Sequence, residues 1–107
     1  MMGVAPYRPV RELESAIERG ELQIAIAIAR DISHERQPIS LELALRLLAL
    51  VAAQGGADYD LWACRWLARW LSEAQRPSIA LAAEVAATLA DIPAEPQAVE
   101  AIRQVVP

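Results

Sequence analysis

Apolar residues recur along the chain at helical spacing, in six runs separated by proline or glycine. Residues three, four and seven positions apart share one face of an α-helix, so such runs predict amphipathic helices. In the first run, Val10, Leu13 and Ile17 form one stripe and Gly20 marks a stop. We expect helices at about residues 9–19, 21–33, 40–54, 58–74, 78–91 and 96–106.

The second of these segments has a pattern that also suits a strand. Residues 24–29 alternate strictly between isoleucine and alanine, and alternation is typical of a half-buried strand. We favour a helix here because alanine is a poor strand former and the flanking residues are helical in pattern. The sequence therefore predicts an all-α fold.

Two of the predicted helices begin with similar residues. Residues 40–44 (SLELA) and 78–82 (SIALA) start 38 positions apart, and a proline precedes each. Helical-hairpin repeats have periods of this size, so a short solenoid-like array of hairpins is the alternative architecture. Because such residues are common at helix starts, we favour a compact bundle of about six short helices. At 107 residues the chain has the size of one domain, which we place at residues 9–107 after an N-terminal tail of residues 1–8.

Charge and composition argue against several classes of partner. Ten basic and fourteen acidic residues give a net charge of -4, and no basic patch stands out that could bind nucleic acid or an anionic membrane. The N-terminus lacks a basic region followed by an apolar run, and every apolar stretch is too short to span a bilayer. We expect a cytoplasmic protein, which also fits the presence of a single cysteine.

The most distinctive feature is the crowding of four of the five aromatic residues between positions 59 and 70. At 100° per residue this helix has one apolar arc that predicts a core-facing stripe, made of Leu61, Cys64, Leu67, Ala68 and Leu71. A second stripe lies roughly opposite, made of Tyr59, Trp62, Trp66 and Trp70. Arg65 and Arg69 border this aromatic stripe. A helix that is apolar on two sides is either central in its domain or meets another molecule with its second side.

Two interpretations of the aromatic stripe remain open. In one, helices from both halves of the chain cover it, and it belongs to the core. In the other, part of it is exposed in the monomer and is covered by a partner or by a second copy, since Trp, Tyr and Arg are enriched at the energetic centres of interfaces. Three helices are apolar around most of their circumference, which is many for so small a domain and favours a homodimer or a stable protein partner.

On this basis we hypothesise a non-enzymatic protein-interaction module, a small adaptor or regulator that self-associates. The predicted binding residues are Tyr59, Trp62, Arg65, Trp66, Arg69 and Trp70. A sensor of small apolar ligands, with Trp side chains lining a pocket between helices, is the first alternative. A helix-turn-helix DNA binder is the second, but no helix displays the dense outward Arg, Asn, Gln or Lys side chains that a recognition helix needs.

Residues suited to catalysis or metal binding are few. His34, the only histidine, lies near the end of a helix, where a cation complements the helix dipole. Cys64, placed on the predicted core stripe and far from His34 in sequence, is not expected to be a nucleophile. No Cys or His pair has zinc-ligand spacing, and the glycines form no phosphate-binding loop. We therefore expect no enzymatic activity, no metal and no cofactor.

Overall fold

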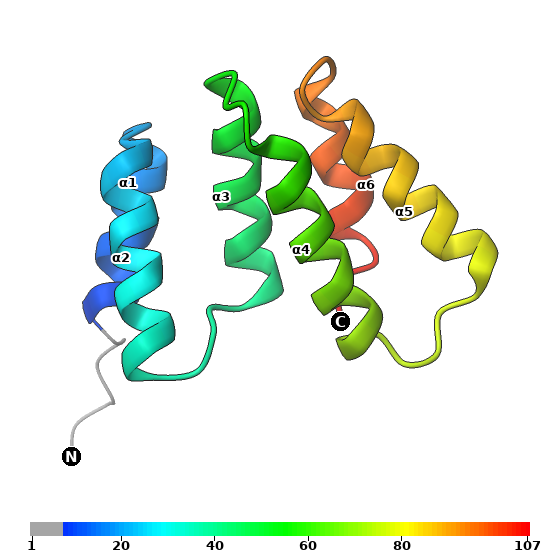
Figure 1. Cartoon of the computed structure of the whole chain (residues 1–107), viewed down its shortest axis with the longest axis horizontal. Coiled ribbons are helices and arrows are strands. Elements are labelled where there is room, and N and C mark those ends of the chain that lie inside the picture. The colour runs from blue at the N-terminus through cyan, green and yellow to red at the C-terminus, as the bar shows by residue number, and fades with distance from the viewer. Residues whose placement is uncertain (1–7) are drawn as a thin grey trace.

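A computed structural model describes residues 8–107, which form six α-helices and one short 3-10 helix (Figure 1). They are α1 (Arg8–Glu18), α2 (Leu22–Glu35), α3 (Leu41–Ala53), α4 (Tyr59–Glu73), α5 (Ile79–Asp91), η1 (Pro96–Ala98) and α6 (Val99–Arg103). No strand occurs in this part of the chain, and the Ile/Ala alternation lies inside α2. The prediction of an all-α fold is confirmed. The predicted tail lies outside the described residues except for Arg8, which is the first residue of α1.

The helix ends follow from local chemistry that the sequence displays. Ser40 and Ser78 cap α3 and α5, with each Oγ accepting a hydrogen bond from the amide three residues later, at 3.1 and 3.0 Å. Such caps satisfy one of the free amides of the first turn. Gly20 and Gly55 end α1 and α3 in the left-handed region, at φ of 72° and 67°, which glycine adopts without strain.

The helices form two layers, with α2, α4 and α5 nearer the viewer and α1, α3 and α6 behind (Figure 1). α3 is central, since it packs on α1, α2, α4 and α6. The last four helices form a closed ring, in which α4 packs on α3, α5 on α4, α6 on α5 and α6 on α3. The α1–α2 hairpin packs on α3 outside this ring. The result is a small bundle with an added hairpin.

The similarity between residues 40–44 and 78–82 corresponds to two similar helix starts and not to a repeated arrangement of helices. α3 and α5 are both 13 residues long and share the serine cap. In an array of repeated hairpins, α5 would pack on α3 in the way that α3 packs on α1. Instead α6 packs on α3, while α5 packs on α4 and α6. The packing of the last four helices as a closed ring therefore differs from the packing expected of a second hairpin repeat.

The hydrophobic core consists of two clusters that meet at α3. The larger fills the ring and contains buried side chains of α3 to α6, among them Leu45, Leu48, Tyr59, Trp66, Trp70 and Leu89. The smaller holds the hairpin and consists of Leu13, Ala16, Ala25, Ile32, Leu43 and Leu47. Leu22 and Trp62 are partly buried and pack against both clusters.

The structure reverses the predicted orientation of α4. Trp66 is 4% exposed and Trp70 1%, whereas Leu61 is 51% exposed and Leu71 44%. Cys64 and Ala68 are also exposed and Leu67 is half-buried, so the prediction that this stripe faces the core is wrong. Both arcs are apolar, and burying the indole rings removes the larger apolar area from water.

Candidate functional site

Three of the six predicted binding residues are structural anchors of the ring. The indole Nε1 atoms of Trp66 and Trp70 donate hydrogen bonds to the carbonyls of Leu41 and Val105, both at 3.0 Å. The Tyr59 hydroxyl, also in a buried side chain, donates to the carbonyl of Leu89 at 2.5 Å. Each anchor thus ties α4 to a different segment while satisfying its own polar atom. For these three residues the structure supports the core interpretation.

Burial of the Tyr59 hydroxyl makes the free energy of unfolding depend on pH in the alkaline range. Desolvation, with a smaller contribution from the neighbouring Asp60 carboxylate, raises the pKa of Tyr59 from 10.0 to about 12. Between these values the unfolded chain has released the proton and the folded chain still holds it, so the free energy of unfolding falls as pH rises. We expect a loss of roughly 2 kcal/mol between pH 10 and pH 12, measured by urea unfolding. Tyr59→Phe should flatten this dependence, and an unchanged slope in that variant would contradict the assignment.

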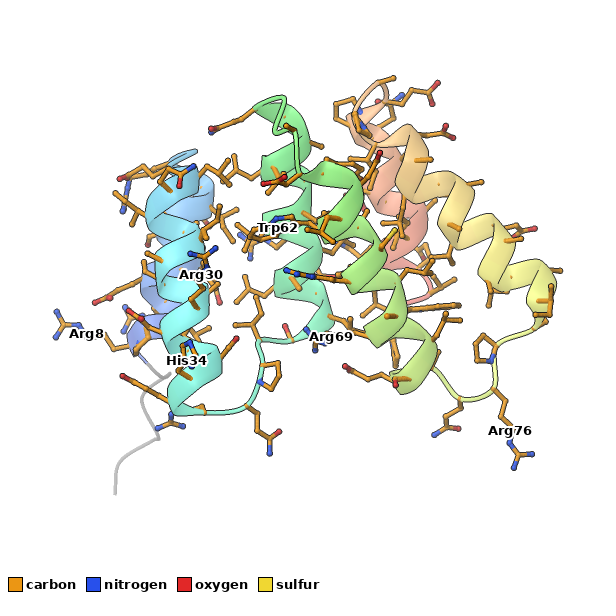
Figure 2. The ribbon with its side chains drawn as sticks, viewed as in Figure 1. Arg8, Arg30, His34, Trp62, Arg69 and Arg76 are labelled. Atoms are coloured by element: carbon orange, nitrogen blue, oxygen red, sulfur yellow. The ribbon has the colours of Figure 1, made fainter. Side chains whose placement is uncertain are left out.

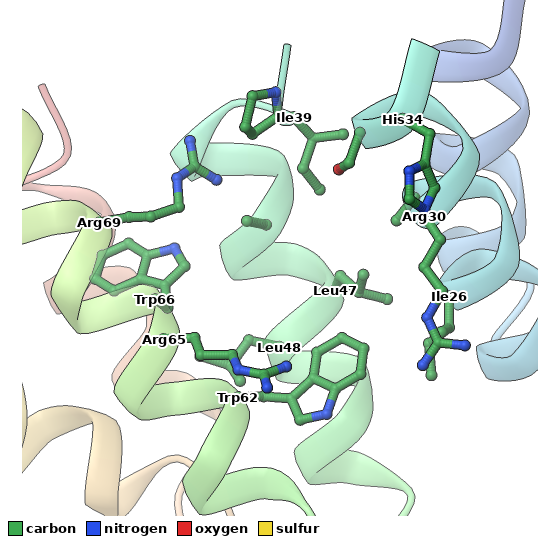
Figure 3. A pocket seen from close by; sticks show the side chains of 14 residues that line it. Ile26, Arg30, His34, Ile39, Leu47, Leu48, Trp62, Arg65, Trp66 and Arg69 are labelled. Carbon is green, nitrogen blue, oxygen red and sulfur yellow. The ribbon is translucent and has the colours of Figure 1, made fainter. Parts of the chain in front are cut away.

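The other three predicted residues, Trp62, Arg65 and Arg69, line a groove between α2 and α4, and the buried Trp66 also contributes to its lining (Figure 3). α2 and α4 do not pack on each other, because α3 lies between them and forms the floor. The groove has a volume of about 360 Å³. This size lies in the range of ordinary ligand sites.

The floor and lower walls of the groove are apolar. Ile26 and Ala29 come from α2, Leu47 and Leu48 from α3, and Ile39 from the preceding loop. On the α4 side, Trp62 stands as the aromatic wall of the groove (Figure 3). A partner with apolar side chains would therefore meet a surface that gains from losing contact with water.

The rim of the groove is basic, although the whole chain is acidic. Arg30 and His34 come from α2, and Arg65 and Arg69 from α4 (Figure 3). Figure 2 shows Arg30, His34 and Arg69 in the whole molecule. No Asp or Glu is among the lining residues. The Arg69 guanidinium forms an ion pair with Glu73 at 3.0 Å. Within residues 8–107, the side chains of Arg30 and Arg65 form neither an ion pair nor a hydrogen bond, so two guanidinium groups on opposite walls have free donors.

The α2 wall of this groove was not predicted from the sequence. Ile26, Arg30 and His34 follow at spacings of four, which places them on one helical face. That spacing was a usable signal for a polar edge on an apolar helix. That this edge lies opposite Arg65 and Arg69 depends on the packing of both helices on α3 and could not be read from either helix alone.

Within residues 8–107, the remaining reactive side chains do not assemble into a second site. Cys64 is exposed, which corrects its predicted place in the core. Among residues 8–107, no group of three His, Cys, Asp or Glu side chains is placed to hold a metal ion. The helices of this part of the chain include none with the length and apolar character needed to cross a membrane. Comparisons with protein-family models, curated proteins and solved structures found no match.

Proposed function

We propose that the protein is a non-catalytic protein-interaction module that binds a segment of a partner protein in the groove between α2 and α4. The observation that carries the proposal is the combination of an apolar floor, an aromatic wall and two guanidinium groups, of Arg30 and Arg65, that have no partner within residues 8–107. The partner segment suited to this groove is an amphipathic helix with apolar side chains on one face and carboxylates beside them. A cytoplasmic setting fits, because the exposed Cys64 would remain reduced there.

The dimensions of the groove favour a short helical segment. From Ile26 to His34 the α2 wall spans nine residues, and the eight steps between them amount to about 12 Å at 1.5 Å per residue. This length matches about two turns of a bound helix, which would place two or three apolar side chains on the floor. The proposed binding surface therefore differs from the one predicted from the sequence. It includes the Trp62 edge of the aromatic stripe and not the whole stripe.

Charge complementarity favours a partner segment that carries carboxylates. Guanidinium groups bind carboxylates through paired, charge-assisted hydrogen bonds, and such bonds are about twice as strong as neutral ones. Arg30 and Arg65 come from opposite walls, so carboxylates on both sides of a bound helix could be held. A basic segment would instead meet an uncompensated like charge.

The proposal is tested with two synthetic helical peptides of one length and one leucine pattern, the first with glutamates beside the leucines and the second with lysines. We expect calorimetry to detect binding of the acidic peptide only. Arg30→Glu and Arg65→Glu should each weaken this binding by about tenfold or more, corresponding to about 1.4 kcal/mol. Arg76→Glu makes the same charge change in the α4–α5 loop, away from the groove (Figure 2), and should have little effect.

Two outcomes would contradict the proposal. Equal binding of the two peptides, or equal weakening by Arg76→Glu, would show that the groove does not select the ligand. Binding of decanoate with displacement by neither peptide would favour the small-ligand sensor, for which the groove volume of about 360 Å³ is also sufficient.

A further inference from the structure

α5 presents an exposed apolar face that is distinct from the groove. At about 100° per residue, its members fall within an arc of about 100°. Ile79, which is 87% exposed, is the one large side chain among them. Glu84 and Asp91 border the arc along one edge, and α5 contains no basic residue. We call this surface the α5 face, and its apolar residues are Ile79, Ala80, Ala83, Ala87 and Ala90.

The charged groups of the α5 face and of the groove are complementary. Within residues 8–107, the carboxylates of Glu84 and Asp91 form neither an ion pair nor a hydrogen bond. The guanidinium groups of Arg30 and Arg65 on the groove rim also lack a partner in this part of the chain. Each copy therefore carries two free carboxylates on one surface and two free guanidinium groups on another. Such groups bind each other through strong, charge-assisted hydrogen bonds.

The shape of the α5 face also suits the groove. Each alanine of the face projects a single methyl group, so the α5 backbone could come close to the walls of a groove of about 360 Å³. The apolar Ile79 side chain matches the apolar floor that Leu47 and Leu48 form. α5 has 13 residues and is about 20 Å long, which is enough to span the α2 wall of the groove.

The two complementary surfaces of one chain are held apart. α4 forms one wall of the groove and α5 packs on α4, with α2, α4 and α5 following one another across the front of the molecule (Figure 1). The surfaces therefore meet only between copies. We infer that the α5 face of one copy occupies the groove of a second copy, with Ile79 on the apolar floor and the two carboxylates beside the guanidinium groups of the rim. The inference rests on the proposed function, because it names the occupant of the same groove.

This contact joins two different surfaces, so it is heterologous, and each copy has one surface of each kind. A second copy is the occupant because every copy carries both surfaces with opposite free charges. A contact limited to one helix in one groove lies at the small end of specific interfaces. We therefore expect reversible self-association that is lost on dilution.

Sedimentation equilibrium over a dilution series tests the inference. The mass of the wild-type chain should rise above its monomer value of 11.7 kDa as concentration increases. Two double variants each disable one surface, Arg30→Glu with Arg65→Glu in the groove and Glu84→Arg with Asp91→Arg on α5. Each should weaken self-association by about a hundredfold or more, because like charges replace opposite ones. Glu12→Arg makes the same kind of charge reversal on α1, outside both surfaces, and should leave self-association unchanged.

Mixing the two double variants provides a second readout. The groove variant keeps its α5 face and the α5 variant keeps its groove, so association should return in an equimolar mixture although each variant alone is monomeric. All four substituted side chains are exposed, so both variants should keep the wild-type circular dichroism spectrum. A merely structural effect of the substitutions would not be reversed by mixing.

The inference would be overturned by a wild-type chain that is monomeric at every concentration, by self-association that persists in either double variant, or by a mixture that stays monomeric. Equal weakening by Glu12→Arg would also contradict it. If the acidic synthetic peptide binds a chain that never self-associates, the second copy is the wrong occupant and the proposed function stands. If neither the peptide nor a second copy binds, both proposals fail.

Discussion

Replacing Trp66 with alanine is expected to lower the free energy of unfolding by about 3–5 kcal/mol, enough to unfold much of the population of a small domain at 25 °C. The Trp66 ring is 4% exposed and contacts the cluster that fills the four-helix ring. Truncation removes this apolar surface, leaves a cavity, and deprives the Leu41 carbonyl of its indole donor. Far-ultraviolet circular dichroism during urea unfolding measures the loss.

Trp62→Ala is the matched control, because it makes the same substitution one turn earlier in α4. Trp62 is only partly buried, and we expect its truncation to cost less than half as much as that of Trp66. If Trp66→Ala keeps its stability and loses self-association, Trp66 belongs to an interface, as the sequence hypothesis stated, and not to the core. Trp66→Phe should recover most of the stability, since it restores the ring and omits the donor.

Replacing Leu13 with alanine is expected to destabilise the α1–α2 hairpin by about 2–5 kcal/mol and to leave the four-helix ring folded. Leu13 has no exposed surface and belongs to the smaller cluster, which shares no buried residue with the larger one. Because the two clusters share no buried residue and are joined through α3 and the partly buried Leu22 and Trp62, loss of packing in one need not disrupt the other. Hydrogen exchange should become faster in α1 and α2 and stay slow in α4 and α6.

Leu61→Ala provides the comparison for this prediction, since Leu61 is 51% exposed and contributes to neither cluster. Its truncation should change the free energy of unfolding of the monomer by less than about 1 kcal/mol. Faster exchange throughout the chain in Leu13→Ala would show that the hairpin and the ring fold as one cooperative unit, contrary to the expectation.

Local signals in the sequence were sufficient to predict the fold class and, to within two residues, the ends of α1 to α5. The last predicted helix, at about residues 96–106, is instead the 3-10 helix Pro96–Ala98 followed by the short α6, Val99–Arg103. The serines at positions 40 and 78 and the glycines at 20 and 55 act within one helical turn, so their effects do not depend on the rest of the chain. The ring closure by α6 on α3 was not predictable in this way. It depends on contacts between helices far apart in sequence, and both a hairpin array and a closed ring would bury the apolar helix faces.

The prediction of which side of α4 faces the core was wrong for a physical reason. Helical periodicity separates the Trp66 arc from the Cys64 arc, but both arcs are apolar, so periodicity alone does not say which one is buried. Side-chain size and hydrogen bonding decide it, because an indole buries a large area and needs an acceptor, which Leu41 and Val105 supply. The groove was partly predicted, through Trp62, Arg65 and Arg69, and its α2 wall was missed because it required the tertiary structure.

Because the groove lies across the boundary between the two clusters, binding of the proposed partner would depend on docking of the α1–α2 hairpin. One wall, α2, belongs to the hairpin, and the other, α4, belongs to the ring. An occupant that contacts both walls binds only when the hairpin is docked, and at a hundred times its dissociation constant it would stabilise docking by about 2.7 kcal/mol. Thermodynamic linkage makes the effect mutual, so a change that undocks the hairpin in part of the population would lower the apparent affinity for the proposed partner in proportion to the docked fraction. A hairpin that detached from the ring would take one wall of the groove with it and would thereby release the proposed partner.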